Sequence, residues 1–127
     1  MSEHEDAGRD RRWPRAVYGV GVEPDPRFTL ANERTFLAWI RTSLALLAAA
    51  VVFGVLTVPL PGWLHSTLTL IPALAAGAGA GAAWFRWART ERALRRSRPL
   101  PGATALAALG TVVVVLVAAV LVGVLAP

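Results

Sequence analysis

The stretch TSLALLAAAVVFGVLTVPLPGWLHSTLTLIPALAAGAGAGAAWF, Thr42–Phe85, contains no Asp, Glu, Lys or Arg. A second uncharged stretch runs from Pro99 to Pro127. About 20 apolar residues cross the roughly 30 Å hydrocarbon core of a bilayer, so the first stretch has room for two transmembrane helices and the second for one. The sequence therefore excludes a soluble globular domain and predicts an all-α integral membrane protein with three transmembrane helices.

The rest of the composition fits a membrane protein. The 127 residues are 55% hydrophobic, and all 13 basic residues are Arg, against eight acidic residues. Most of these arginines flank the uncharged stretches, where membrane topology explains them, so we expect no nucleic-acid partner. Cys is absent, which excludes disulfides and Cys metal sites.

Prolines and glycines divide the chain into segments. Residues 1–27 are polar and contain three prolines, which predicts a flexible cytoplasmic tail. Residues 28–127 predict a three-helix transmembrane domain, with spans at about 36–58, 64–85 and 103–126. Asn32 is a candidate N-terminal cap for the first of these helices.

The distribution of arginines predicts the orientation in the membrane. Six arginines follow the second span and three lie near the start of the first span, whereas the connection between these spans has none; the nine are Arg27, Arg34, Arg41, Arg86, Arg89, Arg92, Arg95, Arg96 and Arg98. Cytoplasmic loops carry the excess of positive charge in multi-pass proteins. We therefore expect a multi-pass plasma (inner) membrane protein with its N-terminus in the cytoplasm and its C-terminus outside.

The side chains of enzymes and metal sites are missing from the apolar part of the chain. Seven of the eight carboxylates come at or before Glu33, the eighth is Glu91, and the two histidines, His4 and His65, are far apart in the sequence. No acid–base pair or metal-ligand set is recognisable in this pattern. We expect a nonenzymatic protein with no catalytic residue, no metal and no cofactor.

Arginines at the edge of the spans are candidate anion-binding residues. Arg34 and Arg41 are seven residues apart, which places them on nearly the same face of a helix, and Arg86 enters the membrane at a comparable level. The planar guanidinium suits phosphate, and rings of Arg line some anion pores, but three helices cannot enclose a channel, so this hypothesis requires an oligomer. Glu33 would then brace a neighbouring arginine. In the alternative, each guanidinium snorkels to water or lipid phosphate.

Small residues in the second span suggest a helix-packing face. Ala73, Gly77 and Gly81 recur every four residues, a spacing that lets helix backbones approach closely. The pattern fits packing within one chain as well as packing between copies.

The segment Asp25–Val52, DPRFTLANERTFLAWIRTSLALLAAAVV, and above all its core Asn32–Leu46, NERTFLAWIRTSLAL, resembles the opening of the YidH-type bacterial inner-membrane proteins, the family of domain of unknown function 202. The three-span layout with an Arg-rich loop before the last span also fits this family. The resemblance covers roughly residues 25–125 and is strongest in its first third.

That family is similar to the small membrane subunit of the eukaryotic vacuolar transporter chaperone, part of a complex that makes polyphosphate and passes it through the membrane. The resemblance implies that Arg34, Arg41 and Arg86 handle a polyanion, with Asn32, Glu33 and Thr35 in supporting positions. This chain has no polymerase domain and no polyphosphate-sensing domain, and Asn32 stands where the eukaryotic pattern tends to have an acid.

Two functions follow as expectations. In the first, the protein forms an oligomer or joins a membrane complex, and its arginines line a path for anions or polyanions such as polyphosphate. In the second, it is a structural or accessory subunit whose Arg-rich arm, residues 86–98, binds anionic lipid or a membrane-complex partner.

Overall fold

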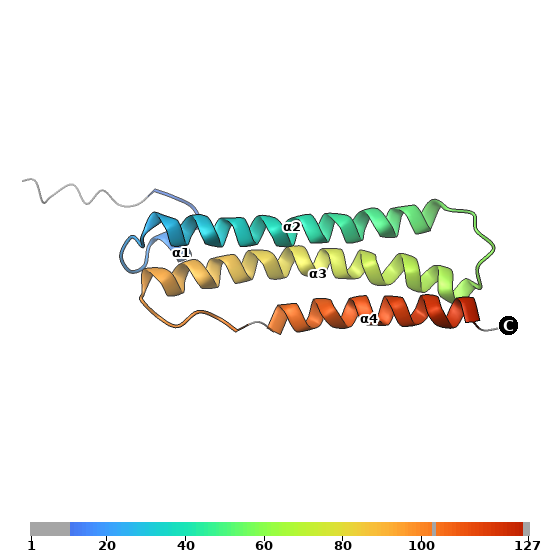
Figure 1. The fold of residues 1–127 in the computed structure, drawn as a ribbon. Helices are drawn as coiled ribbons and strands as arrows, with labels where there is room; N and C mark the ends of the chain where they lie inside the picture. The colour runs from blue at the N-terminus through green and yellow to red at the C-terminus, as the bar shows by residue number, and fades with distance from the viewer. Residues whose placement is uncertain (1–10, 103, 126–127) are drawn as a thin grey trace, which may run out of the picture.

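The structure, a computed structural model, describes residues 11–102 and 104–125, and this part of the chain contains four helices. They are the short α1 (Arg15–Tyr18) and the three long helices α2 (Pro26–Val55), α3 (Gly62–Arg95) and α4 (Thr104–Leu125). Figure 1 shows the three long helices running side by side. Each is long and apolar enough to cross a membrane. The predicted all-α architecture with three membrane-spanning helices is therefore confirmed.

Asp25 and Pro26 start α2 earlier than the sequence pattern suggested. The Asp25 carboxylate accepts a hydrogen bond from the Arg27 backbone N–H at 2.9 Å, and Pro26 occupies the first turn. A carboxylate cap satisfies a free backbone N–H, and proline needs no hydrogen-bond partner at this position. The prediction that Asn32 caps this helix is wrong, because Asn32 lies inside α2 and is buried against α3.

The turn between α2 and α3 matches the prolines of the sequence. Helix α2 ends at Val55, residues 56–61 form the connection, and Pro61 precedes the first residue of α3. The Pro61 carbonyl accepts hydrogen bonds from the N–H groups of Leu64 and His65 at 3.0 and 3.1 Å. Within α3, Pro72 is buried and the helix continues through it.

Helix α3 is the central helix of the molecule (Figure 1). It packs against α2 and against α4, whereas α2 and α4 do not pack on each other within the described residues. Most of the buried apolar side chains between the long helices lie on α3, and they include Leu64, Leu68, Ala76 and Ala83. The described side chains of α4 are all partly or fully exposed. A surface this apolar requires hydrocarbon around it.

Small side chains set the closest approaches between the helices. A Cβ added at Gly79 of α3 would stand 2.7 Å from the Ser43 hydroxyl oxygen of α2. A Cβ added at Gly123 of α4 would overlap the Leu64 side chain of α3. These two glycines therefore allow α2 and α4 to come close to α3.

The predicted packing face lies on a different side of α3. A Cβ added at Gly77 or Gly81 would meet open space, so these two positions do not pack within the chain. Ala73, the third member of the predicted face, is half-buried. Packing of this face between copies remains a prediction.

Residues 11–25, the N-terminal segment, fold over the end of the α2–α3 hairpin. Val17 of α1 is 1% exposed, and the Val22 N–H donates to the Arg95 carbonyl at 2.9 Å. This arrangement differs from the flexible tail predicted for residues 1–27, because the buried Val17 and contacts with α3 hold a segment whose composition is polar. Residues 1–10 of the predicted tail lie outside the described residues.

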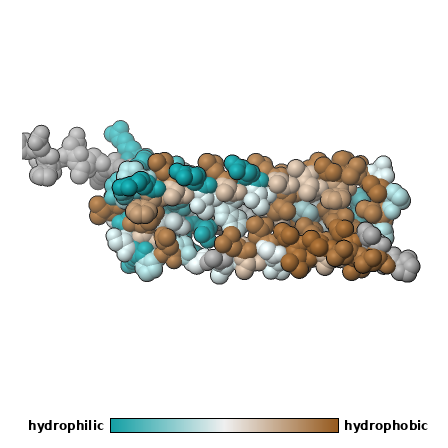
Figure 2. Space-filling view, viewed as in Figure 1, coloured by the Kyte–Doolittle hydropathy of each residue, from teal (hydrophilic) through white to brown (hydrophobic). Residues whose placement is uncertain are grey.

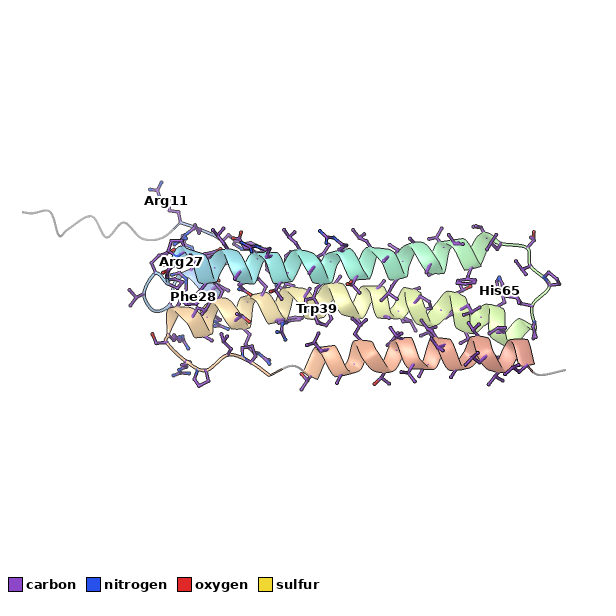
Figure 3. The ribbon with its side chains drawn as sticks, viewed as in Figure 1. Arg11, Arg27, Phe28, Trp39 and His65 are labelled. Atoms are coloured by element: carbon purple, nitrogen blue, oxygen red, sulfur yellow. The ribbon has the colours of Figure 1, made fainter. Side chains whose placement is uncertain are left out.

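The two ends of the molecule differ in polarity. The N-terminal segment, the start of α2 and the end of α3 lie together at one end, called here the arginine-rich end, and the turn at residues 56–61 lies at the other (Figure 1). On the face seen in Figure 2, hydrophilic side chains gather at the arginine-rich end and along part of α2, and hydrophobic side chains gather towards the opposite end. Figure 3 places Arg27 and Phe28 at the arginine-rich end and His65 near the opposite turn. The N-in, C-out orientation remains a prediction.

Candidate anion-binding site at the arginine-rich end

Glu91, the last acidic residue of the chain, is buried between α2 and α3. Its side chain is 1% exposed, and its carboxylate accepts hydrogen bonds from the Thr29 hydroxyl at 3.0 Å and from the Asn32 amide at 3.2 Å. The Asn32 amide also donates to the Trp87 carbonyl at 3.1 Å. Neutral donors thus satisfy the carboxylate within the hairpin. Glu91 is therefore turned away from the arginines on the outer surface of α3.

Arg95 is also buried, but its partners come from the N-terminal segment. Its Nη2 lies 2.7 Å from a Glu23 carboxylate oxygen, and its guanidinium stands 5.0 Å from the centre of the Tyr18 ring. The same Glu23 carboxylate receives two hydrogen bonds from Arg12, at 2.6 and 3.1 Å. Glu23 therefore bridges a buried and an exposed arginine. Glu91 and Arg95 are four residues apart on α3, yet each has partners outside this helix.

Aromatic side chains complete the docking of the N-terminal segment. Trp13 stacks on Trp84 with ring centroids 5.6 Å apart, and Trp84 lies 5.2 Å from Trp87. Tyr18 contacts Trp87 at 6.3 Å. Trp84 and Trp87 lie where the uncharged stretch ends, a position at which tryptophans of membrane proteins gather at the interface. Here they also form the surface on which residues 13–18 rest.

Tyr18 is partly desolvated and lies among charges of both signs. Burial raises the pKa of its phenol above the usual 10.0, and the nearby Glu91 carboxylate raises it further, against the opposing effect of Arg12. The neutral phenol is therefore the form that the docked segment favours.

Arg34 and Arg41 lie on the outer face of α2. Arg34 follows the buried Asn32 by two residues, and Arg41 precedes the buried Ser43 by two residues. At about 100° per residue, each guanidinium starts on the side of α2 opposite to α3. Both arginines are exposed, as is Glu33. Within one chain Arg34 and Arg41 lie on the same face of α2, but they do not face Arg86.

Arg86 belongs to α3 and lies in a groove between α2, α3 and the α3–α4 connection. Its Nη1 donates to the Gly102 carbonyl at 3.4 Å, and the side chain is half-buried. The groove measures about 230 Å³, and Asn32 and Thr35 also line it. Of the six predicted site residues, Arg86, Asn32 and Thr35 are therefore brought together, and Arg34, Arg41 and Glu33 are not.

A second groove at this end contains more arginines than the predicted site. It measures about 500 Å³, and none of its lining residues is acidic; its four arginines are Arg89, Arg92, Arg96 and Arg98. We call it the arginine groove. The sequence shows this cluster of charge but not the burial of Glu91 and Arg95, because each of them has a charged neighbour in the sequence, Arg92 and Arg96 respectively. Their burial leaves the groove without an internal counter-charge.

Comparison with known proteins identifies relatives of the hairpin. The family described as Domain of unknown function (DUF202) matches residues 27–93. An uncharacterized protein of Mycobacterium tuberculosis is 51% identical over 82 residues, which cover 63% of this chain and 66% of that protein, slightly under two thirds of its length. Inner membrane protein YidH of Escherichia coli is 44% identical over 86 residues, which cover 65% of this chain and 72% of that protein. No solved structure shows a significant match.

The matched region corresponds to the α2–α3 hairpin. Residues 27–93 run from the start of α2 almost to the end of α3, so they contain the candidate arginines at 34, 41 and 86 and the buried Asn32–Glu91 pair. The E. coli relative is named as an inner membrane protein, and three helices here are apolar enough to span a bilayer. The chain is therefore a multi-pass inner-membrane protein of the YidH type and belongs to the DUF202 family.

Proposed function

We propose that this protein is a nonenzymatic accessory protein of the inner membrane that binds phosphate-bearing anions at the membrane surface through the arginine groove. The observation that carries this proposal is the separation of charge on α3: four arginines line the groove, while Glu91 is buried on another side of the helix. Each arginine near an anionic surface contributes about 1 kcal/mol, so four of them favour binding by up to about 4 kcal/mol. Headgroups of anionic lipids are the nearest such anions.

The test compares two triple variants with the same change in charge. Arg92, Arg96 and Arg98 are replaced by Gln in the first variant, and the exposed Arg11, Arg15 and Arg27 in the control variant. After gentle extraction, mass spectrometry measures phosphatidylglycerol relative to phosphatidylethanolamine bound per chain. We expect the enrichment of phosphatidylglycerol to fall in the groove variant and to persist unchanged in the control. Equal enrichment in both variants would contradict the proposal.

The same proposal requires the arginine-rich end to face the cytoplasm. The positive-inside rule supports this orientation, because that end contains the arginines and the turn at residues 56–61 contains none. Alkaline phosphatase, which is active only outside the cytoplasm, should be active when fused after Pro127 and inactive when fused before Met1. The opposite pattern would overturn the orientation.

A second candidate function is an oligomeric path for anions or polyanions such as polyphosphate, lined by Arg34, Arg41 and Arg86. Open space beside Gly77 and Gly81 favours it, because a neighbouring helix can approach α3 there. The outward position of Arg34 and Arg41 also suits a ring to which each copy contributes arginines.

Oligomeric state and anion flux test this second candidate together. Native mass spectrometry should show a multimer, and Arg41→Ala should reduce anion flux into liposomes while expression and assembly persist. A monodisperse monomer in mild detergent would remove the path. If flux is absent from both proteins and the groove variant alone loses phosphatidylglycerol, the accessory function remains.

A further inference from the structure

A hollow runs along α3 on the side where α4 packs. Its walls are made mainly of small side chains from both helices, namely Ala75, Ala78, Gly79, Ala82, Ala105 and Ala108. Trp39 of α2 closes part of it. Because alanine and glycine leave room that larger side chains would fill, the packing of α4 on α3 is incomplete over this stretch. The surface of the hollow is almost entirely apolar.

The hollow opens at one end onto two arginines. Ala82 and Ala105 also line an adjoining cavity of about 180 Å³, and Arg86, Arg89 and Thr104 belong to the lining of that cavity. An apolar slot therefore leads directly to two guanidinium groups and a hydroxyl. This combination matches an amphiphile with a phosphate at one end.

The length of the slot matches one leaflet of a bilayer. Helix α3 rises about 16 Å over the eleven residue steps from Ala75 to Arg86. Half of the hydrocarbon core is about 15 Å thick. An acyl chain along α3 would thus extend from the level of the arginines to the middle of the membrane.

We propose that this slot holds one anionic phospholipid of the leaflet at the arginine-rich end, with its phosphate at Arg86 and Arg89 and one acyl chain along the alanine-lined surface of α3 and α4. The site adjoins the arginine groove and shares Arg89 with it, whereas Arg86 and the apolar slot lie outside that groove.

The size of the slot favours a lipid over a transmembrane helix of a second copy. Over the roughly 10 Å from Ala75 to Ala82, a helix about 10 Å wide occupies about 800 Å³. The space between the walls is about 490 Å³ even with its open side included. An acyl chain is the slimmer occupant, and its charged headgroup complements the two arginines.

Matched variants on neighbouring residues test the site. Ala108→Leu fills the slot, whereas Ala107→Leu adds the same side chain at the adjacent exposed position, which lines none of the cavities described above. Arg86→Gln removes a phosphate ligand, and Arg15→Gln is its charge control. Ala78→Leu fills the slot from α3 and serves if Ala108→Leu does not fold.

The measurement is native mass spectrometry of protein released from nanodiscs that contain equal amounts of phosphatidylglycerol and phosphatidylcholine. We expect one retained phosphatidylglycerol per chain, and a decrease of tenfold or more in Ala108→Leu, Ala78→Leu and Arg86→Gln but not in the two controls. Equal retention in all folded variants would overturn the proposal. The Arg92, Arg96 and Arg98 variant should keep this lipid, which separates the slot from the arginine groove.

A competition experiment distinguishes a lipid from a free phosphate anion. Glycerophosphoglycerol carries the same headgroup without acyl chains, so it should bind much more weakly than phosphatidylglycerol, and Ala108→Leu should not affect its binding. If glycerophosphoglycerol binds as tightly as the intact lipid, the site takes a soluble phosphate and the lipid assignment is wrong.

Discussion

Asn32 of α2 donates a hydrogen bond to the carboxylate of Glu91 of α3 at 3.2 Å, across 59 residues of sequence. Asn32 also bonds to the backbone of α3 at Trp87, so one amide holds both a side chain and a carbonyl of the neighbouring helix. Because both residues are buried, the bond fixes the position of α3 along α2 at the arginine-rich end.

Replacing Asn32 should loosen this end of the hairpin. In Asn32→Ala the Glu91 carboxylate and the Trp87 carbonyl each lose a donor, and we expect the free energy of unfolding to fall by about 1–3 kcal/mol. Unfolding by SDS in mixed micelles, followed by circular dichroism, measures the change. Glu33→Ala removes an exposed side chain next to it and should have little effect. An unchanged free energy in Asn32→Ala would show that the buried pair does not hold the hairpin.

Two glycines on opposite sides of α3 should respond differently to the same substitution. Gly79→Leu inserts a side chain where only 2.7 Å separates a Cβ from the Ser43 oxygen, so we expect it to push α2 from α3 and lower stability by about 1–3 kcal/mol. Gly81→Leu enters open space and should leave the monomer stable. If copies pack through this face, Gly81→Leu should instead lower the oligomer fraction measured by native mass spectrometry. Loss of monomer stability in Gly81→Leu alone would contradict the helix arrangement.

The helices can be predicted from the sequence, but the contacts between their ends cannot. Long uncharged stretches predict the three spans, because a helix in hydrocarbon needs apolar side chains, and the prolines at 59 and 61 predict the turn, because proline has no backbone N–H to donate within a helix. Both effects depend only on residues that are close in the sequence. Three of the candidate site residues, Arg86, Asn32 and Thr35, line one groove, and the role predicted for them stays a prediction. The burial of Glu91 and Arg95 depends on partners more than 50 residues away, and a period of 3.6 residues cannot indicate those partners.

Titration of Tyr18 should report the docking of the N-terminal segment. Tyr18 is the only tyrosine of the chain, and burial together with the Glu91 charge raises its pKa above 10.0. Because the undocked phenol releases its proton first, the docked state should lose stability as the pH rises above about 10. Tyrosinate absorbance measures the pKa, which should fall towards the usual value in Glu91→Gln. A native pKa at or below that of the denatured protein would show that Tyr18 is not docked.

Gly21 offers a direct test of whether the N-terminal segment is held in place. Its φ of +66° suits glycine, and a Cβ at this position would overlap the Arg95 carbonyl. The left-handed conformation alone costs a residue with a side chain about 1–2 kcal/mol, so Gly21→Ala should raise the undocked population at least about fivefold.

Trypsin cleavage measures this undocked population, because trypsin cleaves after the exposed Arg11, Arg12 and Arg15. When opening is fast relative to cleavage, the rate of cleavage follows the undocked population. Gly62→Ala, at the opposite end where a Cβ meets open space, is the control and should be cut at the wild-type rate. Equal cleavage of Gly21→Ala and wild type would mean that the segment is undocked in both proteins, and the contacts of Glu23 and Tyr18 with Arg95 would then not persist in the membrane.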